Sequence, residues 1–381
     1  MLSGNRLRAH GMRIAFYAPL KSPDHPIPSG DRRVAQLFLA ALWAAGHEAF
    51  LASRFRSYDR CGDHARQARL ASLGGRLAER FLAPCRTVPE IAPELWFTYH
   101  LYHKAPDWLG PVVSAALSIP YVIAEASDAP KQALRAWAIG RQAAEGAIRR
   151  ADAVIGLNPA DSDCVVPLLR DPWRWIPINP FIDAASYPTP MRDGNGPPRL
   201  IVVAMMRYGD KLASYQVLGD ALARLLDLSW TLEVVGDGPA RGAVEQALEP
   251  VSARVTWAGA VSATAVAERL AAADLCVWPA FNEAFGMALL EAQASGLPVV
   301  AGDSGGVGQI VIPHVTGLLV PPADASAFAD AVRSLVLDRS RRAGLAKAAR
   351  QRVRAEHDIS TAARRLDAVI AMVSRPHRAV R

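Results

Sequence analysis

Two glutamates, Glu283 and Glu291, stand eight residues apart across the predicted start of a helix. An apolar strand is predicted over 275–279, a short polar loop follows it, and the helix should open near Phe285. The first backbone N–H groups of a helix have no partner within it, and the positive end of its dipole lies there, so this start favours an anion such as phosphate. Glu291, two turns further on, is suited to accept hydrogen bonds from sugar hydroxyls. The amides expected to face the anion belong to Phe285, Gly286, Met287 and Ala288.

The same spacing also has a plain structural interpretation. Acidic residues are common in the first turn of a helix because they stabilise its dipole. The sequence Gly-x-Pro at 296–298 is an ordinary helix stop. Spacing alone therefore leaves a nucleotide site and a structural helix start as open alternatives.

Short apolar segments alternate with amphipathic segments along the whole chain, which is typical of parallel sheets covered by helices. Residues 187–198 are rich in proline and glycine and poor in apolar residues, so they are predicted to link two domains. Two doubly wound domains would place ligands at the carboxyl ends of their strands, in the cleft between them. The predicted strands are 14–18, 49–52, 95–98, 121–124 and 153–157 in the first half, and 200–204, 231–235, 255–258, 275–279, 298–301 and 317–320 in the second.

The composition is that of a globular protein. With 381 residues, 51% of them hydrophobic and 21% charged, the chain predicts two domains and excludes extensive disorder. No apolar run approaches the roughly 18 residues that a membrane-spanning helix needs. The basic residues 1–11 lead into no apolar region and do not resemble a signal peptide, so Met12 is a second candidate for the start. Four cysteines without metal or redox spacing are predicted to be buried free thiols in a reducing cytoplasm: Cys61, Cys85, Cys164 and Cys276.

The net charge of +7 at pH 7 favours anionic partners. Eight arginines fall within 54–86, and leucines and a phenylalanine recur between them at helical spacing. Such a basic amphipathic segment is either a solvated helix face packed on its own domain or a site that docks on an anionic membrane surface. No nucleic-acid recognition motif and no interleaved stacking aromatics occur, so nucleic acid is not an expected partner.

The full string around the glutamates is more specific than their spacing. It reads Glu-x-Phe-Gly at 283–286, Glu-Ala at 291–292, Gly-x-Pro-Val-Val-Ala at 296–301 and Gly-Gly at 305–306. This pattern resembles the Glu-x7-Glu motif of the retaining glycosyltransferases of the group 1 family. The resemblance implies an α/β fold with the GT-B architecture, in which two Rossmann-like doubly wound parallel-sheet domains face a central cleft. It also implies that the last helix crosses back onto the first domain.

With this architecture, the chain divides into four predicted segments. An acceptor-side Rossmann-like domain covers 12–186, and the linker covers 187–198. A nucleotide-sugar-binding Rossmann-like domain covers 199–360. A C-terminal helix and a basic tail cover 361–381, and the tail from residue 374 onward is expected to be disordered.

In the second domain, the resemblance implies donor-binding roles for residues that follow predicted strands. Arg207 and Lys211 match, at the shorter of two spacings, the family's Arg–Lys pair, whose charge neutralises the leaving diphosphate. Gly236 lies in a Gly-x-Gly-Pro turn that borders the nucleotide in the family, although a plain strand–helix turn explains it equally well. Glu291 is implied to bind the ribose, and Glu283 the transferred sugar.

In the first domain the match is partial. Ser29 and Gly30 match half of a Gly-Gly pair that flanks the reaction centre in the family, and Ser29 or Asp31 is expected to cap the following helix. His100, after the third strand, corresponds to a histidine that is often present there. The family's more important active-site histidine is absent, and Glu125 stands near its place as a candidate base for the acceptor hydroxyl.

One apparent metal motif has a structural explanation. Asp161 and Asp163 form an Asp-x-Asp sequence, but they follow Asn158-Pro at a helix start, where capping and pairing with the dipole explain both. GT-B enzymes generally work without a bound metal. The predicted reaction therefore needs no cofactor besides its sugar donor.

Together these features predict a retaining glycosyltransferase that moves a sugar from a nucleotide diphosphate sugar to a hydroxyl of a glycan or lipid-linked acceptor, in bacterial cell-envelope or exopolysaccharide synthesis. The candidate catalytic residues are Glu283, Glu125 and His100. The expected location is the cytoplasm, with 54–86 in contact with the inner face of the plasma membrane. The alternatives are a nucleotide-sugar epimerase of the same fold and a non-catalytic subunit that binds nucleotide sugars.

Overall fold

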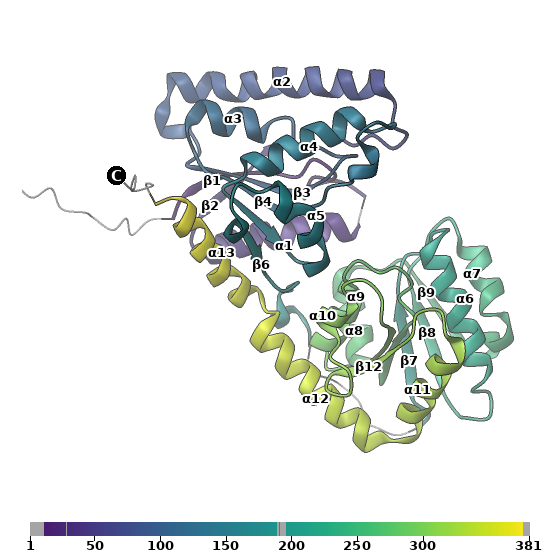
Figure 1. The fold of residues 1–381 in the computed structure, drawn as a ribbon. Coiled ribbons are helices and arrows are strands. Elements are labelled where there is room, and N and C mark those ends of the chain that lie inside the picture. The colour runs from purple at the N-terminus through teal and green to yellow at the C-terminus, as the bar shows by residue number, and fades with distance from the viewer. Residues whose placement is uncertain (1–10, 28, 189, 191–195, 376–381) are drawn as a thin grey trace, which may run out of the picture. The chain divides into compact units, whose positions relative to one another are not determined.

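The computed structural model describes residues 11–27, 29–188, 190 and 196–375, which form two compact α/β units (Figure 1). The first unit runs to Ile178 and resumes at Ile359, and the second unit is Asn179–Asp358. The chain therefore passes between the units twice.

The predicted linker, 187–198, differs in position from the observed division at Ile178 and Asn179. Residues 179–184 already belong to the second unit because hydrogen bonds tie them to its last residues. The backbone N–H of Ala184 donates to Asp358 Oδ1 at 3.1 Å, and a ring nitrogen of His357 lies 2.7 Å from the carbonyl oxygen of Pro180. Residues 189 and 191–195 of the predicted linker lie outside the described residues.

The first unit is built on a parallel sheet whose strand order is β2-β1-β3-β4-β5-β6. The order changes direction between β1 and β3, which makes their carboxyl ends the switch point where ligands bind in such sheets. The strands are β1 (Arg13–Tyr17), β2 (Glu48–Ser53), β3 (Leu95–Leu101), β4 (Tyr121–Ala126), β5 (Ala153–Gly156) and β6 (Trp175–Pro177).

Helices cover both faces of this sheet (Figure 1). On one face, α3 (Gly110–Leu117) and α4 (Ala138–Arg150) contact β3 and β4, and the long α2 (His64–Thr87) packs over them. On the other face, α1 (Gly30–Ala44) packs against α13 (Ile359–Val373), the last helix of the chain. The short α5 (Ser162–Val165) follows β5.

The second unit also holds a six-stranded parallel sheet, in the order β12-β11-β10-β7-β8-β9. Counted within the unit from β9, this is the order 3-2-1-4-5-6 of dinucleotide-binding folds, and its switch point lies between β7 and β10. The strands are β7 (Arg199–Val203), β8 (Thr231–Val235), β9 (Val255–Gly259), β10 (Leu275–Trp278), β11 (Val299–Gly302) and β12 (Gly317–Val320).

Two groups of helices cover this second sheet. In one group, α6 (Asp210–Ala223) packs against α7 (Arg241–Ala247) and α11 (Ala325–Leu337). In the other, α9 (Met287–Ala294) packs against α8 (Ala263–Ala272) and α12 (Arg339–Glu356). The four-residue α10 (Val307–Ile310) follows β11.

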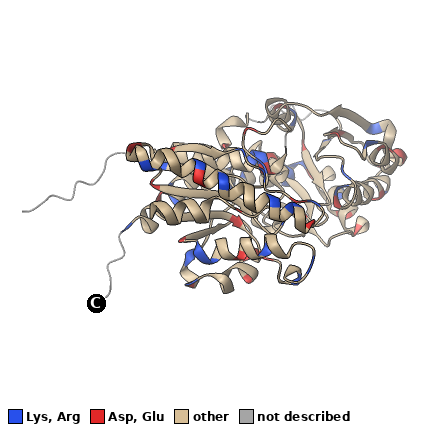
Figure 2. Ribbon diagram, turned by 90° about the horizontal axis from the view of Figure 1, so that it is seen from above, with Lys and Arg blue, Asp and Glu red and all other residues tan. Residues whose placement is uncertain are grey.

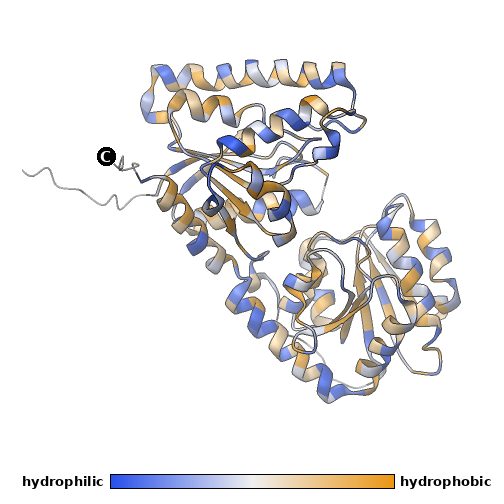
Figure 3. Ribbon diagram, viewed as in Figure 1, coloured by the Kyte–Doolittle hydropathy of each residue, from blue (hydrophilic) through white to orange (hydrophobic). Residues whose placement is uncertain are grey.

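The hydropathy of the chain explains this layering. Figure 3 shows the strands as the most hydrophobic elements of both units, while the helices carry hydrophilic residues on their outer sides. Each of the predicted strands is present, with ends shifted by at most three residues. Strand β6 was not predicted, because its three residues, Trp-Ile-Pro, are too few to show a periodic pattern.

Candidate functional site

The loops that follow β7 and β10 meet at the switch point of the second unit. The β10–α9 loop (residues 279–286) is fastened to the start of α6 by two hydrogen bonds. The backbone N–H of Phe281 donates to Ser214 Oγ at 2.9 Å, and the Asn282 side chain donates to Asp210 Oδ2 at 3.0 Å. The position of this loop is thus set by α6, the helix that also carries Lys211.

Glu283 and Lys211, which are 72 residues apart in the sequence, form an ion pair within this unit. The same carboxylate oxygen, Oε2, accepts a hydrogen bond from Trp278 Nε1 at 3.2 Å. Lys211 Nζ also lies 5.3 Å from the centre of the Trp278 ring, so the tryptophan contacts both partners. Two of the predicted site residues are therefore in direct contact, and Trp278 is a third member that the sequence analysis did not single out.

The backbone of the β10–α9 loop is unusual. Ala280 has φ 55° and Asn282 has φ 48°, and both angles lie in the left-handed region that costs most residues energy. Ala280 is fully buried. Such conformations persist where the surrounding contacts impose them, which is frequent at binding sites.

Helix α9 begins at Met287, two residues later than predicted. Gly286 has φ 77°, a left-handed conformation that cannot belong to the helix, and it precedes the first helical residue. No side chain caps this helix. Among the described residues, the backbone N–H groups of Met287 and Ala288 have no acceptor. These two amides form the predicted anion-binding helix start, whereas Phe285 and Gly286 belong to the loop before it.

The Gly305–Gly306 pair supports the loop that carries Glu283. The N–H of Gly306 donates to the carbonyl oxygen of Ala284 at 2.9 Å. A Cβ on Gly305 would lie 2.0 Å from the carbonyl oxygen of Glu283, and one on Gly306 would lie 2.2 Å from that of Ala284. Only glycine lets the two segments approach so closely, which gives this part of the motif a structural reason.

The other predicted donor-site residues surround the same strand ends. Gly236 has φ 140°, and a Cβ there would lie 2.0 Å from the carbonyl oxygen of Ala204, so its role is to let the loops after β7 and β8 touch. Arg207 is exposed, and its side chain has no partner among the described residues. Glu291 lies half-buried in the second turn of α9.

A second group of predicted residues lies at the switch point of the first unit. Ser29 caps α1, and its side chain accepts a hydrogen bond from the N–H of Arg32 at 3.2 Å. Gly30 is the first, exposed residue of that helix, and a Cβ there would meet no atom within 4 Å. Asp31, the other expected cap, instead forms an ion pair with His100, with Oδ1 3.1 Å from Nδ1.

His100 and Glu125 occupy matching positions on the neighbouring strands β3 and β4, between paired residues on either side. Both have left-handed backbones, with φ 60° for His100 and φ 61° for Glu125. The Glu125 side chain is buried, and its Oε1 accepts a hydrogen bond from the backbone N–H of Leu157 at 2.7 Å. Burial raises the pKa of Glu125 to about 7, although the Leu157 N–H and the charge of His100 act in the opposite direction.

Asp161 corrects an expectation of the sequence analysis. Its side chain does not cap α5; the neighbouring cap is Asn158, whose side chain accepts from the N–H of Ala160 at 3.1 Å. Burial raises the pKa of Asp161, and the charge of His100 partly offsets this. Asp161 is therefore an electrostatic neighbour of His100, and no sequence pattern indicated this.

The sequence of the second unit matches a known family. Residues 197–338 match the sequence model of the glycosyl transferases group 1, and this segment contains the Lys211–Glu283 pair and all of α9. Glycogen synthase of Mycobacterium tuberculosis is 32% identical over 225 residues, which cover 57% of this chain and 53% of that protein. The D-inositol 3-phosphate glycosyltransferase of Rhodococcus opacus is 32% identical over 273 residues, or 66% of this chain and 60% of that protein. The second unit is thus similar in sequence to the group 1 glycosyltransferases.

Solved structures resemble this chain over nearly its whole length. Sucrose-phosphate synthase of Thermosynechococcus elongatus has a TM-score of 0.71 at 21% identity, covering 95% of this chain and 99% of that one. The Anabaena protein HepE in complex with UDP also has a TM-score of 0.71, at 18% identity, covering 95% and 100%. The predicted two-domain α/β fold of the GT-B type is thereby confirmed. The chain spans only about half the length of the first curated relatives that it matches.

The basic segment 54–86 of the chain falls into two parts. Arg54, Arg56 and Arg60 precede α2, and the remaining arginines of 54–86 lie on α2 and are exposed. Ala78 and Leu82 are buried on the side of α2 that packs toward α3 and α4. Figure 2, which looks down onto this helix, shows Lys and Arg spaced along its outer side. No described helix is long and apolar enough to cross a membrane.

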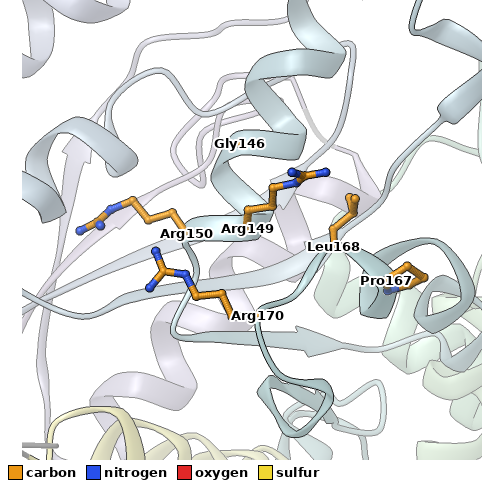
Figure 4. A pocket seen from close by; sticks show the side chains of 6 residues that line it. All are labelled: Gly146, Arg149, Arg150, Pro167, Leu168 and Arg170. Atoms are coloured by element: carbon orange, nitrogen blue, oxygen red, sulfur yellow. The ribbon is translucent and has the colours of Figure 1, made fainter.

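A separate basic hollow of about 610 Å³ lies on the first unit, beside α4. Arg149, Arg150 and Arg170 line it together with Gly146, Pro167 and Leu168 (Figure 4). Arg149 pairs with Glu145 at 2.6 Å, and Arg150 Nε donates to Ser114 Oγ at 3.1 Å. The hollow contains none of the predicted site residues.

Within the described residues, no three His, Cys, Asp or Glu side chains gather as a metal site would require.

The four cysteines are free, as expected, but only Cys85 and Cys276 are buried, and Cys61 is exposed. Cys61 lies in the loop between β2 and α2, where the sequence carries no periodic pattern from which burial could have been judged.

Proposed function

We propose that this protein transfers a sugar, with retention of anomeric configuration, from a nucleotide diphosphate sugar to a hydroxyl group of an acceptor. The observation that carries the proposal is the Lys211–Glu283 pair beside the uncapped start of α9, at the switch point of a sheet with dinucleotide-binding order. The match of residues 197–338 to the group 1 glycosyltransferase model supports it, as do the complexes of the structurally similar Anabaena protein HepE with UDP and UDP-glucose.

The geometry suggests how the donor would be held. The diphosphate would bind the free N–H groups of Met287 and Ala288 and the side chains of Arg207 and Lys211, while Glu291 accepts hydrogen bonds from the ribose. Two cationic side chains and a helix start would stabilise the negative charge that grows on the departing diphosphate. This arrangement needs no metal ion for that purpose.

Donor binding would also change the partner of Glu283. In the structure Glu283 forms an ion pair with Lys211. When a diphosphate takes over Lys211, the carboxylate of Glu283 is released toward the hydroxyls of the transferred sugar, and Trp278 Nε1 remains its anchor. Donor binding would therefore make Lys211 available to the phosphate and Glu283 available to the sugar in one step.

The first unit would bind the acceptor. His100 and the buried Glu125 lie at its switch point, where a polar substrate would meet groups that exchange protons near neutral pH. The exposed arginines of α2 support an acceptor at an anionic membrane surface, for which a lipid-linked glycan of a bacterial envelope is the substrate class that fits. The corresponding location is the cytoplasmic face of the membrane.

The test is incubation with a panel of nucleotide sugars, after thermal-shift screening for the donor that stabilises the protein. Transfer, or slow hydrolysis of the donor, should be lost in Glu283→Ala and kept in Glu268→Ala, which removes an exposed glutamate of α8. Conversion of the donor sugar into its epimer would instead identify a nucleotide-sugar epimerase. Donor binding without turnover for any acceptor would identify a binding subunit, and either result would overturn the proposal.

A further inference from the structure

The ion pair between Asp31 and His100 spans the switch point of the first unit. Asp31 lies in the first turn of α1, which follows β1, and His100 lies at the end of β3. These are the two strands between which the strand order changes direction. A side chain from each of the two elements is thus brought to the place where such sheets bind ligands.

The imidazole of His100 has a well-defined set of neighbours. Its ring packs against Tyr102, with centroids 5.3 Å apart, and against Tyr99, with centroids 5.7 Å apart. The charged groups that act on it are Asp31 from α1, Glu125 from β4 and Asp161 from the turn after β5. Lys21, in the loop after β1, acts on Asp31. About a third of the His100 side chain remains exposed, so a substrate can reach it.

A role for Asp31 as a plain helix-dipole partner does not account for this geometry. Ser29 already caps the helix, and the Asp31 carboxylate is directed at a ring nitrogen of another element at 3.1 Å. The left-handed backbone of His100 is also an energetic cost that the fold sustains at this one point of β3.

We propose that Asp31 is a positioning residue for His100: it accepts a hydrogen bond from Nδ1–H and leaves Nε2 as the ring atom that meets the acceptor. This inference rests on the proposed transferase function and names the residues of its acceptor side. Fixing one nitrogen of a histidine determines which nitrogen is left for the substrate.

The charge states of the cluster agree with this role. Burial lowers the pKa of His100, but the hydrogen bond and charge of Asp31 outweigh it, so the pKa is raised overall. For Asp31, burial acts upward and His100 acts downward, and the net pKa is lowered. Each member of the pair thus favours the charged form of the other. The imidazolium in turn favours the ionised form of Glu125, the form that accepts a proton.

The transfer step balances with these groups. The acceptor O–H bond breaks as its oxygen bonds to the anomeric carbon on the same face that the diphosphate leaves, which retains the configuration, and the proton passes to Glu125, whose Oε1 accepts a hydrogen bond from Leu157 N–H. The bond between the anomeric carbon and the phosphate oxygen breaks, and its electron pair leaves with the nucleoside diphosphate. His100 keeps its proton and, through Nε2–H, donates to the acceptor.

The first test measures His100 without any substrate. In the full-length protein with labelled histidine, NMR should show His100 titrating above its ordinary pKa in the wild type, with His100→Gln used to assign its signal. Asp31→Asn should lower this pKa and change the tautomer of the neutral ring. Asp24→Asn, which removes an acid of the preceding loop that pairs with Arg54, should change neither. Equal pKa and tautomer in Asp31→Asn and the wild type would overturn the inference.

The second test uses the pH profile of kcat/KM for transfer from the donor found by screening. In Asp31→Asn the acid limb should move to higher pH, because the neutral His100 no longer favours ionised Glu125, and KM for the donor should stay unchanged. An unshifted limb with only a lower melting temperature would show a purely structural role and overturn the inference. The NMR result does not depend on turnover, so it separates this failure from failure of the proposed function.

Discussion

At the scale of single residues, the structure gives Lys211 a partner, Glu283. From the sequence, Lys211 was expected to bind the diphosphate and Glu283 to bind the transferred sugar, as two separate contacts. In their ion pair, Glu283 binds Lys211 where the diphosphate would bind, and Lys211 binds Glu283 where the sugar would bind. Two oppositely charged groups that are both more than two-thirds buried lower each other's desolvation cost until the donor arrives.

This pairing predicts opposite effects on nucleotide binding from its two members. Lys211→Ala removes a charge-assisted contact and should weaken UDP binding by about 10- to 100-fold, from roughly 1.5–3 kcal/mol. Glu283→Gln removes the carboxylate that competes with the diphosphate, so UDP should bind as tightly or more tightly, while turnover is lost. Titration calorimetry measures both. Lys347→Ala, an exposed lysine of α12, is the control. Weaker UDP binding in Glu283→Gln would contradict this account.

Glu125 predicts a dependence of stability on pH. Its pKa is about 7 in the folded protein and 4.5 ordinarily, so the folded state holds the proton more tightly. The stability due to this group is fully present below about pH 4.5 and is lost as the pH rises through 7, by up to about 3 kcal/mol. Glu125→Gln has no charge to bury. Its free energy of unfolding relative to the wild type should therefore rise between pH 5 and pH 8.

Denaturant unfolding at a series of pH values measures this difference. Glu268→Gln, which changes an exposed glutamate in the same way, serves as the reference. A difference between Glu125→Gln and the wild type that stays constant or falls as the pH rises would show that Glu125 does not carry the buried proton.

At the scale of elements, the site of the second unit depends on loops that only glycine can bring together. Gly305 combines φ 55° with a position where a Cβ would lie 2.0 Å from the carbonyl oxygen of Glu283. The segment after β11 therefore determines where the β10–α9 loop lies. A change there reaches Glu283 through the backbone and not through any side chain.

Gly305→Ala should destabilise the protein by about 2 kcal/mol or more, because the added methyl group meets both a left-handed backbone and a carbonyl oxygen. It should also reduce turnover more than nucleotide binding, since Glu283 is displaced while Met287 and Ala288 remain. Gly344→Ala is the matched control. Gly344 lies in α12 with no atom near its Cβ position, so alanine should stabilise that helix by about 0.5–1 kcal/mol. Unfolding curves and turnover of the two variants decide the matter, and a neutral Gly305→Ala would refute the steric argument.

At the scale of the whole molecule, the last helix belongs to the unit that the chain begins with. Leu366 is fully buried on α13, which packs against α1, and Asp367 forms an ion pair with His47 at 3.4 Å. The first unit is therefore incomplete until the C-terminus has been made. Its core joins residues that are more than 300 positions apart.

Leu366→Ala should lower the stability of the first unit by about 2–5 kcal/mol, the usual cost of a cavity at a buried leucine. Hydrogen exchange should locate the loss in α1 and the neighbouring strands, and protection in the second unit should not change. Met372→Ala, on the exposed side of the same helix, should have little effect. Equal loss of protection in both units would mean that they unfold together.

The sequence by itself determined the alternation of strands and helices, the two-sheet fold and the motif around Glu283, because these depend on local periodicity and on residue types at short spacing. It placed the start of α9 two residues early, because the left-handed Gly286 leaves no periodic signal. It missed β6, which is too short to show a pattern.

Only the tertiary structure decided which distant residues meet. Strand order brings Lys211 to Glu283 and Asp31 to His100, and no local pattern encodes a contact between residues 72 or 69 positions apart. Burial likewise decided the proton affinity of Glu125, since the desolvation that raises its pKa comes from residues packed around β4. The sequence supplied the chemical groups, and the packing of parallel strands determined their partners and their charge.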